Sequence, residues 1–205
     1  MTNGLKLLEE ICTVDTRHKP TVRISASTGE AIPLQLADLH EAISEIALSG
    51  TTPPDIATHF DIARNLFLYS WFVFDFSTPA QAQAYASVEF AIKERLSAVG
   101  TPGKKHWGLK RLLREAIGRG WIKDGGFPRL RYQNDATPPS GGDRQDFDPE
   151  GTIYCKVMLD AMPHFRNDLA HGSSSLLGSG TSLRVLEVCA AIINQLFPPD
   201  IDASA

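Results

Sequence analysis

The sequence predicts an all-α protein, a single helical bundle with a short N-terminal extended arm or hairpin. Over most of the chain apolar residues recur at intervals of three and four, which is the period of an amphipathic helix. Strand-like alternation is confined to residues 21–25, near the N-terminus. At 205 residues, 42% of them hydrophobic, the chain is long enough to bury the core of one domain.

The first fifty residues differ from the remainder of the chain. Residues 5–12 fit a short helix, and residues 21–25 followed by Ser27-Thr28-Gly29-Glu30 fit a small hairpin or extended arm. The apolar pattern of residues 34–48 predicts the first amphipathic helix, which ends near Gly50. We therefore expect residues 1–50 to pack as an arm and first helix on a bundle formed by residues 51–200, within one structural domain.

Five further helices are expected in the bundle, over residues 55–76, 79–98, 109–117, 151–171 and 181–196. The first of these is apolar nearly all round, which favours a central helix or one that also serves a subunit interface. Pro163 predicts a new helix start or a kink inside the fourth. Gly, Pro and Asp dominate residues 124–150, which we expect to form a long loop.

Positive charge is concentrated in one segment of an otherwise acidic chain. Residues 104–131 hold nine Lys or Arg and two acidic residues, a net charge of +7, whereas the whole chain carries −4. One interpretation is a patch that binds RNA phosphates, with Trp107 or Trp121 stacking on an unpaired base. Its candidate residues are Lys104, Lys105, Lys110, Arg111 and Arg114. The alternative is a solvated helix face with both Trp side chains in the core.

The cysteines and the chain start indicate a cytoplasmic protein. Cys12, Cys155 and Cys189 are odd in number and widely spaced, without a Cys-x-x-Cys pattern, which is typical of reduced thiols. Residues 1–10 lack the basic and then apolar pattern of a signal peptide. The most hydrophobic run, residues 66–74, is too short to span a membrane.

The stretch from Pro163 to Gly172 combines helical periodicity with a chemical pair. A helix advances by about 100° per residue. One apolar stripe, predicted to face the core, would then hold Met158, Met162, Phe165 and Leu169. The opposite side would hold Asp160, His164, Asn167 and His171. Arg166 and His171 would flank a groove that faces solvent or a partner, and Gly172 suits a left-handed cap that leaves His171 in the last turn.

The residues Arg166-Asn167-x-x-Ala170-His171-Gly172 resemble the signature of the HEPN superfamily at those five positions. Residues 87–96 are, more loosely, similar to a helix of several HEPN-like proteins. The resemblance implies an up-and-down bundle of four or five helices, usually dimeric. In many members it also implies a metal-independent endoribonuclease built where two copies of the motif meet, whereas many other members are inactive.

The chemistry of RNA cleavage fits these residues. Attack by the 2′-hydroxyl needs a base, an acid for the leaving oxygen and positive charge on the phosphate. His171 can act as base or acid, Arg166 can form two parallel hydrogen bonds to a phosphate, and Asn167 can orient the His or the substrate. Because one His cannot easily fill both proton-transfer roles, a two-fold homodimer would supply the second.

Three alternatives remain at this point. The groove could belong to a noncatalytic HEPN-type module that binds RNA, a nucleotide or a protein partner. Arg166 and His171 could simply satisfy the dipole and final carbonyls of their helix. A metal site is less favoured because Pro163 disturbs the register and no His-Glu-x-x-His pattern is present; its ligands would be Asp160, His164, Asp168 and His171.

We expect no metal or cofactor. The expected partners are RNA and a second copy, with a neutralising protein as a further candidate, and no membrane.

Overall fold

The computed structural model describes residues 5–25, 27–127, 148–170 and 179–199, with only the backbone of Lys104, Ala170 and Ser179. This part of the chain is mostly helical, as predicted. Its six α-helices are α1 (Leu36–Ser44), α2 (Pro54–Tyr69), α3 (Ser77–Ala98), α4 (Leu109–Gly118), α6 (Ile153–Ala170) and α7 (Ser179–Leu196). A two-stranded sheet of β1 (Val22–Ile24) and β2 (Ala31–Pro33) precedes them. Among the described helices, none combines the length and apolar character needed to cross a membrane.

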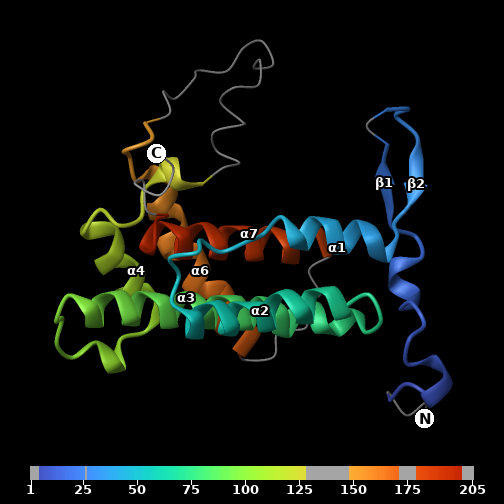
Figure 1. The fold of residues 1–205 in the computed structure, drawn as a ribbon, viewed down its shortest axis with the longest axis horizontal. Helices are drawn as coiled ribbons and strands as arrows, with labels where there is room; N and C mark the ends of the chain where they lie inside the picture. Colours follow the sequence, from blue (N-terminus) through green and yellow to red (C-terminus); the bar gives the residue numbers. More distant parts are fainter. Residues whose placement is uncertain (1–4, 26, 128–147, 171–178, 200–205) are drawn as a thin grey trace.

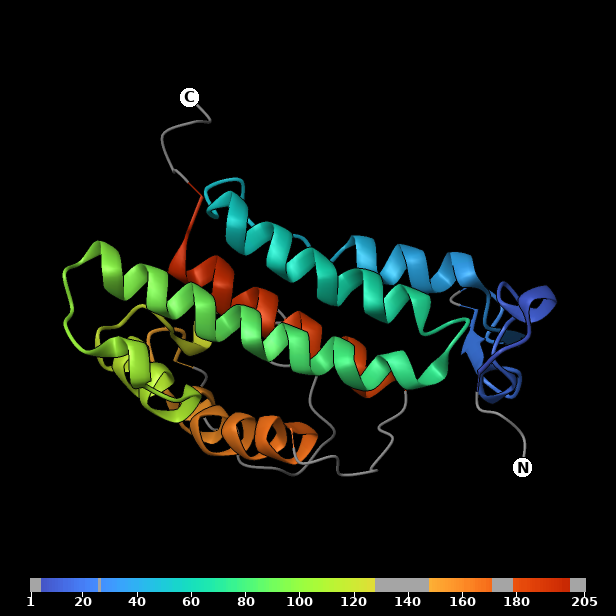
Figure 2. The same ribbon diagram turned by 90° about the horizontal axis from the view of Figure 1, so that it is seen from below.

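The helices form three layers, with α3 and α7 in the middle (Figures 1 and 2). The helices α1 and α2 cover one side of this middle layer, and α4 and α6 cover the other. The central helix is α3, because it contacts α2, α4, α6 and α7. Its buried positions are largely small, including Ala80, Ala84, Ser87 and Ala91, so neighbouring helices can approach its backbone closely. Residues 55–76 are thus not the central helix, and the alternative that they serve a subunit interface stays a prediction.

The helix α2 is also shorter than expected and ends at Tyr69. It begins with Pro54 in its first turn, where the missing N–H costs nothing. At the other end, the Ser70 hydroxyl donates to the Phe67 carbonyl over 2.6 Å, and the chain then turns into the short 3₁₀ helix Phe74–Phe76. Local side-chain bonding to the backbone of this kind competes with continuation of a helix.

The first helix is likewise shorter than predicted, because α1 ends at Ser44 rather than near Gly50. The chain beyond it is held by the end of α7 instead. The Asn194 side chain accepts from the Ser49 N–H over 2.7 Å and donates to the Ala47 carbonyl over 3.0 Å. Ile46 remains buried in the core, so the segment after α1 still packs although it is not helical.

The N-terminal arm lies at one end of the bundle (Figure 1). The predicted hairpin is present, with Val22 opposite Pro33, and Gly29 in its loop has a φ of 73°, which favours glycine. The short helix expected over residues 5–12 is a 3₁₀ turn, Leu8–Glu10, and a second such turn spans Thr16–His18.

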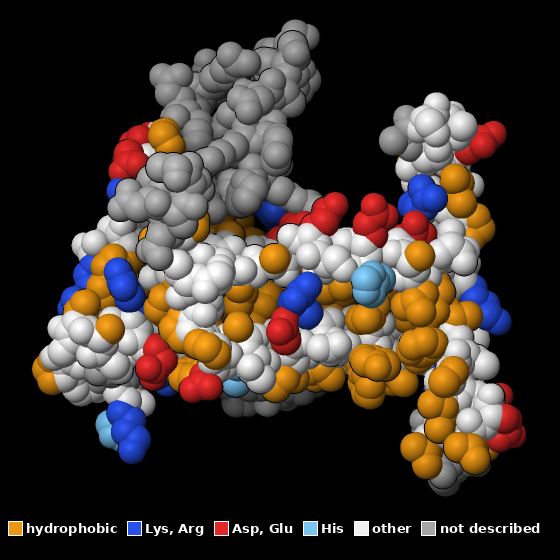
Figure 3. Space-filling view, viewed as in Figure 1, with side chains coloured by type: hydrophobic (Ala, Val, Ile, Leu, Met, Phe, Trp, Pro, Cys, Tyr) orange, Lys and Arg blue, Asp and Glu red, His pale blue; other side chains and the backbone are white. Residues whose placement is uncertain are grey.

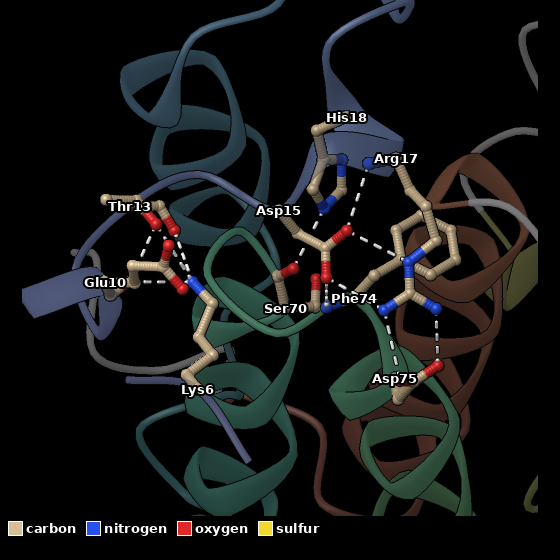
Figure 4. A network of polar contacts seen from close by, with 9 residues as sticks. All are labelled: Lys6, Glu10, Thr13, Asp15, Arg17, His18, Ser70, Phe74 and Asp75. Carbon is tan, nitrogen blue, oxygen red and sulfur yellow. Dashed lines mark hydrogen bonds and ion pairs between the residues drawn. The ribbon is translucent and has the colours of Figure 1, made fainter. Parts of the chain in front are cut away.

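The arm is attached to the bundle by a polar network around Arg17 (Figure 4). The Arg17 guanidinium binds both Asp15 and Asp75, the latter just before α3. The Asp15 carboxylate also accepts from the Phe74 N–H over 3.0 Å, and buried His18 lies 2.9 Å from the Ser70 carbonyl through Nε2. The arm therefore has a defined position on the end of α2.

The helix α6 runs through Pro163 without interruption, so no new helix begins there. Its start is capped from a distant residue. The buried Asp124 carboxylate accepts from the N–H groups of Tyr154 and Cys155, both over 3.0 Å. Burial acts to raise the pKa of Asp124, but these N–H donors outweigh it and hold the pKa below its ordinary value. Most of the loop expected over 124–150 lies outside the described residues.

Candidate functional site

A groove lies between the start of α4 and the later turns of α6. Its volume is about 320 Å³, and it is lined by Gly108, Leu109, Lys110, Arg111, Pro163, Arg166 and Asn167. The basic residues of α4 and the motif residues of α6 were predicted as separate features, more than fifty residues apart. Contacts between α4 and α6 bring four of them, Lys110, Arg111, Arg166 and Asn167, to one groove.

The start of α4 contributes more than its side chains. Gly108 precedes the first turn in an extended conformation, and its carbonyl accepts from the N–H groups of Arg111 and Leu112 over 3.0 and 3.1 Å. Because glycine has no side chain, it cannot cap the N–H groups of that turn. The positive end of the helix dipole therefore faces the groove, an arrangement that favours an anion.

Arg166 is oriented by a carboxylate from the central helix. Its Nε donates to Glu89 Oε1 over 3.1 Å, and Nη1 lies 3.5 Å from Asn167 Oδ1. The Glu89 side chain is only 14% exposed, so the protein encloses the acidic partner and leaves the arginine at the surface. The bond to Nε leaves the Nη1–Nη2 edge for an incoming acceptor, since the Asn167 contact is at the long limit of a hydrogen bond.

Glu89 was not singled out from the sequence as a functional residue. The signal that could have identified it is an acidic side chain within the small and apolar residues of 84–92. A carboxylate in such surroundings needs a cationic partner or hydrogen-bond donors. Lys93, one turn later and 3.9 Å away, is a second cation beside it.

Lys110 is held by an acidic residue of α6. Its Nζ donates to Asp160 Oδ1 over 2.8 Å, and both side chains are exposed. The hydrogen bond and charge of Lys110, and more weakly the charge of Arg114, lower the pKa of Asp160. Exposed ion pairs of this kind contribute little stability, so an anion can compete with Asp160 for Lys110.

The two tryptophans of the basic segment both pack partly against the core. The Arg111 guanidinium lies 4.0 Å from the centre of the Trp107 ring. Trp121 has Arg95 and Arg119 at 5.5 and 5.2 Å from its ring centre. These arginine contacts occupy ring surface that a nucleic-acid base would need, so stacking on Trp107 requires Arg111 to move.

The other predicted RNA-binding residues are not part of the described groove lining. Lys105 and Arg114 are exposed but do not line the groove. The Lys104 side chain lies outside the described residues, as do His171 and Gly172. Of the predicted pair, the structure therefore describes Arg166 and not His171, because α6 is defined as far as Ala170.

The prediction that Phe165 belongs to the buried apolar stripe of α6 is wrong. Met158 and Met162 are buried and Leu169 packs against the core, but Phe165 is 47% exposed. The buried side of α6 is rotated toward Cys155, where α3 and α4 cover it. Phe165 instead continues an exposed apolar row that includes Ile153 and Val157, at 58% and 60% exposure.

A metal site needs several ligating side chains close together. Within the described part of the chain, no three His, Cys, Asp or Glu side chains are grouped to hold a metal ion. His164 Nε2 lies 3.3 Å from Asp168 Oδ2, and Asp160 is bound to Lys110. With His171 outside the described residues, the four proposed ligands are not tested as a set.

Comparison of the chain with protein-family models, curated protein sequences and solved structures finds no match in any of the three. The fold and the groove are thus described from the chain's own residues.

Proposed function

We propose that the chain is a HEPN-like, cytoplasmic, metal-independent endoribonuclease that acts as a homodimer and holds an RNA phosphate in the α4–α6 groove. The observation that carries this proposal is the convergence of Lys110 and Arg111 with Arg166 and Asn167. Three cationic side chains and a helix N-terminus around one groove suit a phosphate better than a neutral ligand.

Each groove residue can make a different contact with the phosphate. Arg166, fixed at Nε by Glu89, offers its planar Nη edge to two phosphate oxygens. Lys110 and Arg111 add charge that attracts the RNA backbone, and the first turn of α4 supports the same anion. The proposal assigns proton transfer to His171, which follows the last described residue of α6, with Asn167 orienting it or the substrate.

The homodimer is supported by the exposed apolar row of α6, Ile153, Val157 and Phe165, which lies on the same helix as the motif. A large apolar row at a surface is typical of an interface. A second copy packed along this row would form the proposed homodimer.

Cleavage of a generic RNA in EDTA tests the proposal. The wild-type protein should cleave, and His171→Ala should lower the rate by about 10²- to 10⁴-fold because proton transfer is lost. RNA affinity and the melting temperature should stay near wild type. A wild-type protein that binds RNA without cleaving it in EDTA would reject the ribonuclease.

A binding-only module is the second candidate, and one observation favours it. Among the groove-lining residues that the structure describes, none is a histidine, the side chain whose ordinary pKa lies closest to neutral. These residues suffice to bind phosphate, whereas cleavage depends on His171. Equal RNA affinity with no cleavage in either the wild type or His171→Ala would identify this candidate.

The α6 interface has its own test. Val157→Glu should lower both the assembly mass, measured by light scattering, and the cleavage rate, because it buries a charge at the interface. Val99→Glu, at an exposed apolar residue just after α3, is the matched control and should change neither. If Val157→Glu keeps both properties, α6 is not the interface.

A further inference from the structure

The N-terminal segment presents apolar side chains to solvent. Leu5 and Leu8 are 78% and 84% exposed, and Leu7 and Ile11 are also at least half exposed. Single exposed leucines are common in proteins, but four apolar side chains within seven residues form a patch. Figure 3 shows hydrophobic side chains along this segment and over the adjoining end of the bundle.

This segment has a defined shape (Figure 4). Lys6 Nζ donates to the carbonyls of Glu10 and Thr13 over 3.0 and 2.7 Å, and the Thr13 hydroxyl donates to the Glu10 carbonyl over 2.7 Å. The Asp15 N–H donates to the Trp71 carbonyl over 2.9 Å, next to the Arg17 network. The leucines are thus presented by a structured turn fixed to the bundle, which lowers the entropy lost on binding.

A second groove lies at the same end of the molecule, between the start of α1 and the end of α2. Its volume is about 540 Å³, and it is lined by Leu36, Ala37, His40, Glu41, Leu68, Tyr69 and Phe72. Five of these seven residues are apolar or aromatic. Phe72 belongs to the turn that also carries Trp71 and Phe74, to which the arm is attached.

We propose that the N-terminal segment of each copy places Leu5, Leu8 and Ile11 in the α1–α2 groove of a second copy. The exposure of these side chains shows that they do not fill the groove of their own chain, and the Arg17 network fixes the segment in that position. One chain therefore carries both halves of the contact at one end, and a two-fold axis forms the contact twice. Because the contact forms twice, the buried area is doubled, which brings it closer to the roughly 1,200–2,000 Å² that stable interfaces bury.

This interface is separate from the one assigned to α6, because α1 and α2 lie in the layer opposite α4 and α6 (Figure 2). If both interfaces form, the assembly is larger than a dimer, and loss of either leaves a dimer. If only the arm interface forms, its loss leaves a monomer. The mass of an arm variant therefore falls in either case, whether or not the proposed ribonuclease is correct.

The first test is the assembly mass of Leu8→Glu/Ile11→Glu by analytical ultracentrifugation. Each lost apolar side chain should weaken association by about tenfold or more, so the mass at micromolar concentration should fall by half. Val99→Glu should keep the wild-type mass. An unchanged melting temperature would show that the double variant is folded, and an unchanged mass would overturn the proposal.

Thiol crosslinking identifies the occupant of the groove. Cys12 is exposed beside Ile11, whereas Cys155 and Cys189 are buried. An untagged wild-type chain is mixed with a tagged Cys12→Ser/His40→Cys chain and treated with a bifunctional thiol reagent. We expect a crosslink between tagged and untagged chains, and none with a tagged Cys12→Ser/Val99→Cys control.

Two crosslinking results would overturn the proposal. In a His40→Cys chain that keeps Cys12, crosslinking only within one chain would show that the segment fills its own groove. Absence of any crosslink to position 40, with wild-type folding, would show that the segment and the groove do not meet. Neither result depends on RNA cleavage.

Discussion

Two arginines, Arg17 in the arm and Arg166 in the α4–α6 groove, each bind a carboxylate from a distant part of the chain. All three nitrogens of Arg17 are engaged, with Asp15 bound through Nε and Nη2 and Asp75 through Nη1 and Nη2, at 2.8–3.0 Å. Arg166 binds one carboxylate, through Nε, and has a 3.5 Å contact at Nη1.

The two arginines differ in how many of their N–H donors are already bound to carboxylates. The carboxylates around Arg17 consume its planar donor edges, so it can attach the arm but has little capacity for a ligand. This pairing lowers the pKa of Asp15, first through the side-chain hydrogen bond from Arg17, and raises the pKa of Arg17. At Arg166 the single carboxylate fixes the side chain while one edge stays accessible. We infer that Arg17 stabilises and Arg166 binds.

Of the changes that test this difference, Arg166→Lys should have the largest effect, because it keeps the charge and removes the planar donor edge. Loss of one donor to a transition-state phosphate costs roughly 10²- to 10³-fold in rate, and we expect a loss of that size in RNA cleavage. The melting temperature should change little, because Arg166 is at the surface. If Arg166→Lys cleaves RNA at the wild-type rate per folded molecule, the inference that Arg166 binds the phosphate is wrong.

The matched change Arg17→Lys should lower stability and leave RNA cleavage unchanged. Asp15 is only 12% exposed on its side chain, and it would lose two hydrogen bonds from a charged partner. A cost of about 1–3 kcal/mol corresponds to a melting temperature lower by several degrees for a chain of this size. RNA cleavage measured below that transition should be unchanged; a reduced rate would link the arm to the groove.

Joint neutralisation of Lys110, Arg111 and Arg114 sharpens the comparison through salt dependence. Replacing all three by Gln should weaken RNA binding, and the slope of log affinity against log salt should fall by about 0.7–0.9 for each phosphate that is no longer neutralised. The control neutralises Lys19 and Arg23, which are exposed cations of the arm. Equal slopes for the triple variant and the wild type would leave the α4 cations as a solvated surface.

Acid should affect the arm through Asp15. Because its pKa is lower in the folded state, its contribution is complete above the unfolded value of about 3.9 and is lost as pH falls below it. Unfolding measured between about pH 5 and 2 should show a shallower loss of stability for Asp15→Asn than for wild type. Asp75→Asn, at an exposed partner of the same arginine, should alter the curve less.

The smallest effect is expected for Asp160→Asn. It releases Lys110 from an exposed ion pair, and pairs of this kind contribute little, so RNA should bind no more than a few-fold more tightly. Stability should be nearly unchanged. Weaker RNA binding in fluorescence titration would indicate that Asp160 positions Lys110 instead of competing for it.

The sequence by itself determined the helical fold class and the approximate position of every described α-helix, and it limited the N-terminal region to a hairpin or an extended arm, because apolar periodicity and turn residues act locally. Pro54 at the start of α2 and Gly29 in the hairpin loop are local signals of this kind. The motif residues and the basic segment could likewise be identified from the chain as candidates, and their roles stay a prediction.

Only the tertiary structure decided how these parts meet. That α3 is central and that Phe165 faces solvent both depend on which helices cover which side, and periodicity does not encode this. The groove arises because α4 packs on α6, and Glu89 reaches Arg166 from a third helix, 77 positions away. Contacts between residues so far apart follow from packing of the whole bundle, so no local pattern in the sequence specifies them.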